Sequence, residues 1–144
     1  MQIRPAVPDD APAIAPLLAQ LGYPTAPDAL AQRLERAAAS DVDATWVAVA
    51  EGPPAVIGFA AGHRFSPVEL DAPVSELTTI VVDQGVRRSG AGRALVTAYE
   101  DWSLAAGCIR MSLGTAFFRT DAHRFYEDLG YEQLARKYEK NIPH

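Results

Sequence analysis

The sequence predicts a single α/β (α+β) domain in which helices cover both faces of a mixed sheet. The chain has 144 residues, close to the roughly 150 residues of an average domain. Its hydrophobic share of 49% and its charged share of 22% are those of an ordinary globular protein. Along the chain, apolar residues recur in turn at the spacing of strands and at the spacing of helices, which indicates a sheet packed between helices.

The first part of the chain predicts a strand followed by two helices. Residues 2–6 form the short strand. A helix follows, because four apolar residues recur at the spacing of one helical face: Ile14, Leu17, Leu18 and Leu21. Pro16 lies inside this helix and is expected to bend it or to shift its start, and Gly22 ends it. Leu30 and Leu34, on an alanine-rich background, predict a second, shorter helix.

A hairpin and a further strand occupy the middle of the chain. Residues 45–50 and 56–61 are rich in β-forming residues and flank a Gly-Pro-Pro turn, a pattern typical of a hairpin. A looser, proline-marked segment follows over residues 63–73. Residues 76–82, Glu-Leu-Thr-Thr-Ile-Val-Val, have the composition of a strand.

The last part predicts a long helix, a strand, a second helix and a terminal strand. The long helix is indicated by apolar residues at intervals of four, three and four: Leu95, Tyr99, Trp102 and Ala106. Gly107 ends it, and residues 109–113 then alternate as a strand. Residues 122–129 are expected to form a helix, and residues 131–142 a terminal strand pair or one long strand.

Composition and charge exclude several classes of protein. The net charge of −5 lacks the basic footprint of a nucleic-acid binder. The one cysteine, Cys108, cannot form a disulfide framework or a cysteine-based zinc site, and we expect no metal. The longest apolar stretches are far shorter than the ~20 residues that span a bilayer. Residues 1–4 do not resemble a signal peptide, and we expect a cytoplasmic protein.

The turn at residues 82–93, Val-Asp-Gln-Gly-Val-Arg-Arg-Ser-Gly-Ala-Gly-Arg, joins a strand to the long helix. Small residues at the start of a helix let backbone N–H groups approach a ligand, and the helix N-terminus adds partial positive charge. Arg87, Arg88 and Arg93 supply further positive charge. The turn therefore predicts a phosphate or pyrophosphate site; the alternative is a tight turn whose arginines serve solubility.

Two common phosphate motifs do not match this turn. A P-loop requires lysine after its second glycine, but Ala91 follows Gly90. A dinucleotide fingerprint requires glycine or alanine three residues after Gly92, where Leu95 stands, and an acidic residue about 20 residues further on, which is missing. A phosphate- or nucleotide-binding module of another fold is therefore a weak alternative.

Two segments resemble the signatures of one enzyme superfamily. Residues 87–92, Arg-Arg-Ser-Gly-Ala-Gly, are similar to the Arg/Gln-x-x-Gly-x-Gly/Ala motif of the GNAT superfamily of acyl-CoA-dependent N-acyltransferases. Residues 122–131, Ala-His-Arg-Phe-Tyr-Glu-Asp-Leu-Gly-Tyr, resemble its second signature, Ala-x-x-x-Tyr-x-x-x-Gly-Phe/Tyr. The resemblance covers essentially the whole chain. It implies the GNAT fold: a mixed, mostly antiparallel sheet that splays between its fourth and fifth strands, with helices on both faces.

The resemblance also implies a site for acetyl-CoA. Backbone groups at Ile80, Val81 and Val82 would hold the pantetheine arm, and an N–H near Val82 would polarise the thioester carbonyl. The turn would hold the pyrophosphate through seven residues: Arg87, Arg88, Ser89, Gly90, Ala91, Gly92 and Arg93. Many members of the superfamily carry asparagine where Arg119 stands, so that contact is not carried over to this chain.

Two catalytic residues follow from the same resemblance. Tyr126 matches the general acid that protonates the departing thiolate, because a phenol with a pKa of about 10 is protonated at neutral pH; the alternative is an aromatic residue packed on the sheet. Glu76, eleven residues before Arg87, is the leading candidate for the general base. Its alternatives are a carboxylate that only attracts an ammonium group and a solvent-facing residue at a strand end. His63 is a weaker candidate, since a lone histidine in a loop is more often a surface residue.

The implied function is an N-acetyltransferase that moves an acetyl group from acetyl-CoA to a primary amine of a small molecule or peptide, by direct attack in a ternary complex. Glu69, Asp71 and Glu76 give the expected acceptor side an acidic character. This suits a polyamine, an aminoglycoside or a lysine side chain without choosing among them. The alternative is a non-catalytic acyl-CoA-binding or regulatory domain of the same fold. We expect no nucleic-acid or membrane partner, and the resemblance suggests a homodimer.

Overall fold

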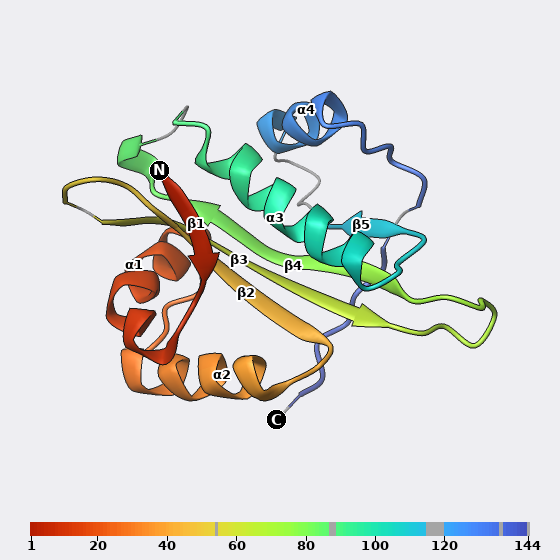
Figure 1. The fold of residues 1–144 in the computed structure, drawn as a ribbon, viewed down its shortest axis with the longest axis horizontal. Helices are drawn as coiled ribbons and strands as arrows, with labels where there is room; N and C mark the ends of the chain where they lie inside the picture. Colours follow the sequence, from red (N-terminus) through yellow and green to blue (C-terminus); the bar gives the residue numbers. More distant parts are fainter. Residues whose placement is uncertain (54, 87–88, 115–119, 136, 144) are drawn as a thin grey trace.

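The computed structural model describes residues 1–144 except 54, 87–88, 115–119, 136 and 144. Helices and strands follow the predicted order as far as the last helix (Figure 1). In chain order they are β1 (Gln2–Pro5), α1 (Ala11–Leu21), α2 (Pro27–Ala39), β2 (Asp43–Val49), β3 (Val56–Phe65), β4 (Val74–Val82), α3 (Ala91–Ala105), β5 (Met111–Leu113) and α4 (Thr120–Asp128). Short 3-10 turns precede α1 and follow β4.

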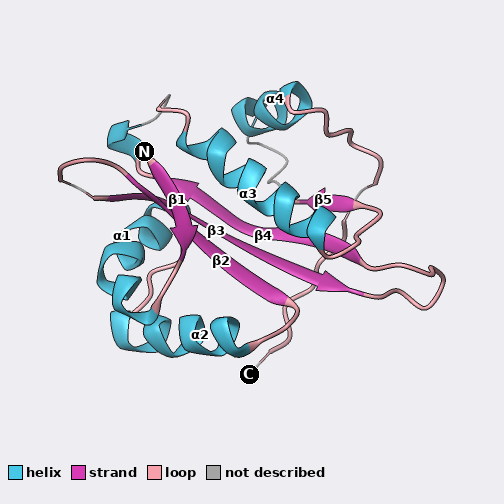
Figure 2. Cartoon of the chain, in the orientation of Figure 1, coloured by secondary structure: helices cyan, strands magenta, loops and turns pink. Residues whose placement is uncertain are grey.

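The strands form one mixed sheet in the order β1-β2-β3-β4-β5. The strands β1 to β4 pair with one another in antiparallel fashion, and β5 runs parallel to β4. Figure 2 shows α3 crossing in front of the strands, with α4 beyond it, while α1 and α2 lie together on another side of the sheet. The predicted class, a mixed and mostly antiparallel sheet with helices on both faces, is confirmed.

The sheet opens between β4 and β5. Among the described residues, these strands pair only over Ser75–Leu77 and Met111–Leu113, whereas β4 continues to pair with β3 as far as Val82. The register of β3 against β4 shifts at Leu77–Thr79, so that Thr78 is an extra residue on β4. A bulge of this kind bends and twists the strand that carries it. The splay expected between the fourth and fifth strands is therefore confirmed, and it begins directly after Leu77.

Two apolar cores lie on opposite faces of the sheet. Under α1 and α2, the core includes Ile14, Leu34 and Val47. Under α3 and α4, it includes Leu77, Leu95 and Tyr99. The alternation of side chains along a strand assigns every second residue to each face. This alternation decides which face of the sheet each candidate site residue reaches.

Two predictions about the chain's elements are wrong. Residues 63–65 belong to β3 and not to a loose segment, because they pair with β2 or β4. The described residues of 131–143 form no strand. Glutamate, glutamine, lysine and alanine, which form strands poorly, dominate this segment, and three of its apolar residues are exposed: Leu134, Tyr138 and Ile142.

Candidate active site

The predicted phosphate turn leads into the N-terminus of α3. Gly90 precedes the helix with φ of +85°, a left-handed conformation that glycine adopts without steric cost. The Ser89 hydroxyl accepts a hydrogen bond from the Ala91 N–H at 3.3 Å. Ser89, Gly90 and Arg93 are exposed, so the positive end of the helix dipole faces solvent. Arg87 and Arg88 lie outside the described residues, as does Arg119.

Gly92 allows a close approach between two helices at this end of the molecule. A Cβ atom at Gly92 would stand 3.4 Å from the ring of Phe125 on α4. A larger side chain would push α4 away from the start of α3. The two sequence signatures, one in the turn and one on α4, are therefore neighbours in space.

The edge of β4 runs from this turn to the point where the sheet opens. Ile80 and Val82 pack against the core under α3, while Val81 belongs to the core on the other face. Among the described residues, no strand pairs with the β5-facing edge of β4 beyond Leu77. Backbone N–H and C=O groups need partners, so this edge can accept an extended ligand as though it were a strand.

Tyr126 lies on α4 within the core under α3. Its side chain is 9% exposed, and its ring packs edge-on against Phe125 and Tyr131 at centroid distances of 5.2 and 6.2 Å. Tyr131 in turn donates a hydrogen bond of 2.8 Å to Glu100; its burial, followed by this contact with a carboxylate, raises the pKa of Tyr131. Tyr126 is thus held in a packed aromatic group that also contacts the inner face of β4 and β5.

Glu76 lies on the opposite face of the sheet from Tyr126. Its neighbours Ser75 and Leu77 face α3, since the Ser75 hydroxyl bonds to Tyr99 and Leu77 belongs to the core there. Glu76 therefore points to the other face, with its side chain 35% exposed and 3.9 Å from the ammonium of Lys137. It sits two residues before the bulge and pairs with Ser112, one position before the last pair shared by β4 and β5.

A row of polar residues crosses four strands through Glu76. The register places Asp43 opposite His63, His63 opposite Glu76, and Glu76 opposite Ser112. Directly paired residues present their side chains on the same face, about 5 Å apart at Cβ. His63 Nδ1 lies 2.8 Å from Asp43 Oδ1, and the imidazole stacks on Phe65 with ring centroids 6.1 Å apart. We call Asp43, His63, Glu76 and Ser112 the polar row.

Electrostatics within the row favour an ionised Asp43. Burial works to raise the pKa of Asp43, but hydrogen bonds from Ser40 and His63 and the attraction of a charged imidazole together outweigh it and hold this pKa below its ordinary value. The carboxylate is then a hydrogen-bond acceptor only. Asp43 was absent from the sequence prediction. The signal that could have found it is the hairpin register, since Asp43 lies two residues before the predicted strand 45–50.

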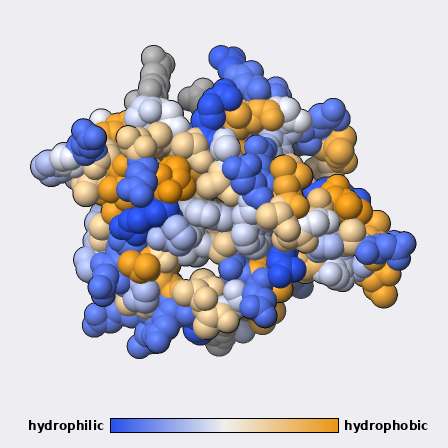
Figure 3. Space-filling view, viewed as in Figure 1, coloured by the Kyte–Doolittle hydropathy of each residue, from blue (hydrophilic) through white to orange (hydrophobic). Residues whose placement is uncertain are grey.

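The hairpin tip between β3 and β4 projects beyond the polar row. It exposes Phe65 and, completely, Val68, and the adjacent Glu69 and Asp71 are exposed as well. Figure 3 shows apolar surface at the end of the molecule where this hairpin projects, on the right. Apolar and acidic groups therefore flank the row on its outer side.

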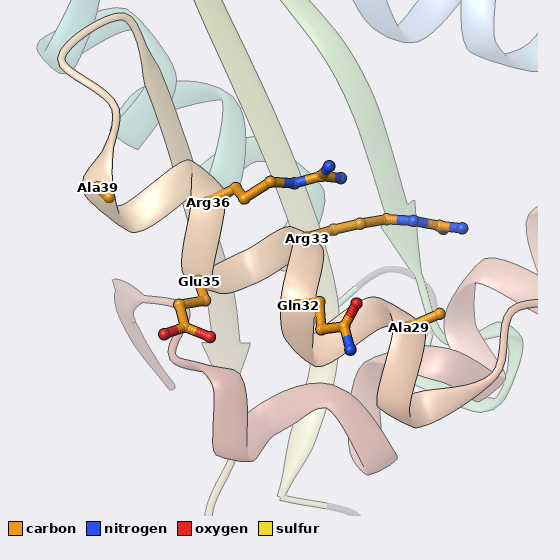
Figure 4. Close-up of a pocket in the computed structure, with 6 residues that line it drawn as sticks. All are labelled: Ala29, Gln32, Arg33, Glu35, Arg36 and Ala39. Atoms are coloured by element: carbon orange, nitrogen blue, oxygen red, sulfur yellow. The ribbon is translucent and has the colours of Figure 1, made fainter.

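A shallow hollow elsewhere on the surface is separate from these features. It is lined only by α2, through Ala29, Gln32, Arg33, Glu35, Arg36 and Ala39 (Figure 4). None of the helices in the described ranges has the length and apolar character needed to cross a membrane. The described residues also hold no group of three or more His, Cys, Asp or Glu side chains placed to bind a metal ion.

The turn, the open edge of β4 and α4 all lie within a segment that matches one known family. The pattern of the acetyltransferase (GNAT) family matches residues 12–131. The chain belongs to the acetyltransferase (GNAT) family. It is 30% identical over 137 residues to aminoglycoside N(6′)-acetyltransferase type 1 of Stenotrophomonas maltophilia, an alignment that covers 93% of this chain and 88% of that protein. The predicted acyltransferase activity class is thereby confirmed.

Solved structures of the GNAT fold agree. The aminoglycoside N-acetyltransferase AAC(6′)-Iy in complex with CoA has a TM-score of 0.83 to this chain at 26% identity, and covers 98% of this chain and 93% of that one. A transcriptional regulator from Bacillus halodurans C-125 has a TM-score of 0.88 at 19% identity, with 98% and 99% covered. The second likeness concerns the fold alone. The first shows that a relative with this fold binds CoA.

Proposed function

We propose that this GNAT protein transfers an acetyl group from acetyl-CoA to a primary amine of a small cationic molecule, by direct attack in a ternary complex. The observation that carries the proposal is the open edge of β4. It begins beside the glycine turn and ends at Leu77, next to Glu76, so a phosphate site, an extended slot and an acidic group follow one another along a single strand.

The described residues of this path fit CoA. The free N–H groups in the first turn of α3 suit a pyrophosphate, and Ser89, Gly90, Ala91, Gly92 and Arg93 surround them. The unpaired edge at Ile80, Val81 and Val82 suits the amides of a pantetheine arm. Bound there, acetyl-CoA supplies the thioester that the amine attacks.

Glu76 and Tyr126 act from opposite faces of the sheet. A slot between two diverging strands is open to both faces, so Glu76 meets the incoming amine while Tyr126 serves the departing sulfur. The Glu76 carboxylate attracts the ammonium form of the acceptor and is a candidate to accept its proton. The Tyr126 phenol donates a proton to the thiolate as the C–S bond breaks.

The acceptor is proposed to be a cationic amine of the aminoglycoside kind. Two aminoglycoside acetyltransferases are among the relatives. On the acceptor side, Glu69, Asp71 and Glu76 provide negative charge, and the apolar Phe65 provides a surface for a sugar ring. A polycation gains from several such carboxylates at once, which favours it over a neutral amine.

Calorimetry and a thiol-release assay test the proposal. The purified chain should bind acetyl-CoA with micromolar affinity and should bind neither ATP nor NAD. Thiol release should then rise with an aminoglycoside that carries a 6′-amine and not with its 6′-hydroxyl analogue; a polyamine and a lysine peptide complete the panel. Absence of acetyl-CoA binding would overturn the proposal. Binding without release for any amine would favour the non-catalytic alternative.

A further inference from the structure

The Asp43–His63 pair stands directly beside the candidate base Glu76, and the three side chains occupy the same face of the sheet. Ala44, Gly62, Ser75 and Leu77 all face α3. The residues that alternate with them, Asp43, His63 and Glu76, therefore face away from α3. The row crosses these strands at Glu76 and Ser112, one position before the last pair shared by β4 and β5, and so lies next to the end of the open edge.

The hydrogen bond to Asp43 decides which imidazole nitrogen can accept a proton. An ionised carboxylate cannot donate, so the 2.8 Å contact requires Nδ1 of His63 to carry the hydrogen. In the neutral ring the lone pair is then on Nε2, which is the nitrogen left for a ligand. Stacking on Phe65 further limits rotation of the ring. The imidazole is therefore held in one tautomer.

We infer that His63, oriented by Asp43, accepts the proton of the acceptor amine, while Glu76 holds the ammonium in place. The inference rests on the proposed acetyl transfer. It assigns proton acceptance to His63 and ammonium binding to Glu76. An imidazole is a stronger base than a carboxylate and is better matched to neutral pH. His63 is a catalytic residue in this scheme, and Asp43 is a positioning residue.

The proton balance of the reaction closes with these groups. The ammonium gives one proton to Nε2 of His63, and the freed lone pair forms the C–N bond with the thioester carbon. The C–S bond breaks, and Tyr126 protonates the thiolate. The second proton lost by the nitrogen restores Tyr126. The imidazolium, stabilised by Asp43, returns its proton to water, which reaches it because the His63 side chain is 41% exposed.

The charged groups around the imidazole come from three directions. Asp43 faces it from β2 and Glu76 from β4, and the described C-terminal segment contributes Lys137, whose ammonium contacts Glu76. Lys137 thus lies beyond Glu76 and not against the imidazole. A base must be neutral to accept a proton, so base catalysis by His63 gives a rate that rises with pH and then levels off.

Three variants test the inference at saturating acetyl-CoA and with one acceptor throughout, so that titration of the acceptor is common to all. His63→Gln should lower kcat by about 10²-fold, leave acetyl-CoA affinity unchanged and lose the rising limb of the pH–rate profile. Asp43→Asn should lower kcat less and move that limb to lower pH, because a neutral amide stabilises the imidazolium less than a carboxylate does. Asp41→Asn, on the same turn, is the matched control and should behave as wild type.

The outcomes distinguish a failure of this inference from a failure of the proposed acetyl transfer. A wild-type chain that acetylates amines while His63→Gln keeps its kcat and pH profile would overturn the inference and leave the function standing. A wild-type chain that acetylates no amine would remove both. If the rising limb of the pH–rate profile does not move in Asp43→Asn, Asp43 does not orient the base. Thermal unfolding of each variant verifies that it is folded.

Discussion

The hydroxyl oxygen of Ser75 on β4 lies 2.8 Å from that of Tyr99 on α3, and both residues are fully buried. Ser75 also bonds to the equally buried Ser103, at 2.7 Å. This small network ties the strand that carries Glu76 to the helix that begins at the glycine turn. It therefore fastens α3 to β4 close to Glu76.

Removing one hydroxyl from this network should destabilise the fold. Tyr99→Phe leaves Ser75 with one buried partner fewer, which costs about 1–3 kcal/mol. The change should appear as a lower urea midpoint with an unchanged slope. Tyr23→Phe is the matched control, because Tyr23 is 66% exposed. Equal midpoints for the two variants would mean that the network adds nothing to stability.

A charge placed in the glycine turn should abolish CoA binding. Gly90→Glu sets a carboxylate beside the pyrophosphate site, and calorimetry should detect no binding of acetyl-CoA. Gly107→Glu is a close control at the other end of α3: its φ of +79° imposes a similar backbone strain, and a Cβ there also meets open space. If Gly107→Glu lost affinity as severely, strain alone would explain the effect.

Loss of the Tyr126 hydroxyl should slow turnover without weakening CoA binding. Tyr126→Phe removes the proposed proton donor and keeps the aromatic packing, so kcat should fall by about 10²-fold. Thiol-release kinetics and calorimetry on one preparation measure both quantities. Tyr138→Phe, at a residue 93% exposed, provides the baseline. Unchanged kcat in Tyr126→Phe would reject the acid role.

The Arg4–Asp10 pair should give the fold a defined sensitivity to acid. Arg4 donates two hydrogen bonds of 2.8 Å to Asp10, and these, with the Val7 N–H, hold the pKa of Asp10 below its ordinary value. Because the folded-state pKa is depressed, the stabilisation is present above the unfolded value of about 3.9 and is lost as pH falls through the folded value.

Arg4→Met should therefore be less stable than wild type at pH 7, by about 1–3 kcal/mol, and the gap should close in strongly acidic solution. Urea midpoints measured from pH 7 down to pH 2 test this, with Arg33→Met on the exposed side of α2 as the control. A gap that stayed constant across the series would indicate lost packing and not lost charge pairing.

The contact of Lys137 with Glu76 should compete with a cationic acceptor. An exposed ion pair is worth at most about 1 kcal/mol, so Lys137→Met should lower the KM of the acceptor by up to about fivefold and leave kcat unchanged. Lys140→Met on the same segment should leave KM as it is. A rise in KM for Lys137→Met would instead assign Lys137 to substrate binding.

Much of this site could be predicted from local sequence, because its parts are local. The glycine turn, the strand before it and the aromatic helix each have a pattern within about ten residues. Glu76 was proposed as a site residue from its distance along the chain from the turn. The order of strands and helices up to α4 followed from the spacing of apolar residues, and it is correct.

The polar row could not be predicted in the same way, because it depends on register. The hairpin of β2 and β3 shifts at Ala48–Val49, and β3 and β4 shift at Leu77–Thr79. A slip of one residue moves a side chain to the opposite face. Only these irregularities determine that Asp43, His63 and Glu76 share a face. The terminal segment was mispredicted because residues that form strands poorly dominate it.

The open edge of β4 predicts that the enzyme without acetyl-CoA aggregates and unfolds more readily than the enzyme with acetyl-CoA bound. A strand with unpaired backbone groups is a template on which other chains can pair, and natural proteins usually block such edges. If acetyl-CoA binds along this edge, as we propose, the edge cannot be blocked permanently. Acetyl-CoA would then cover the edge as an added strand does. Resistance to aggregation and to thermal unfolding would therefore rise with the concentration of the cosubstrate.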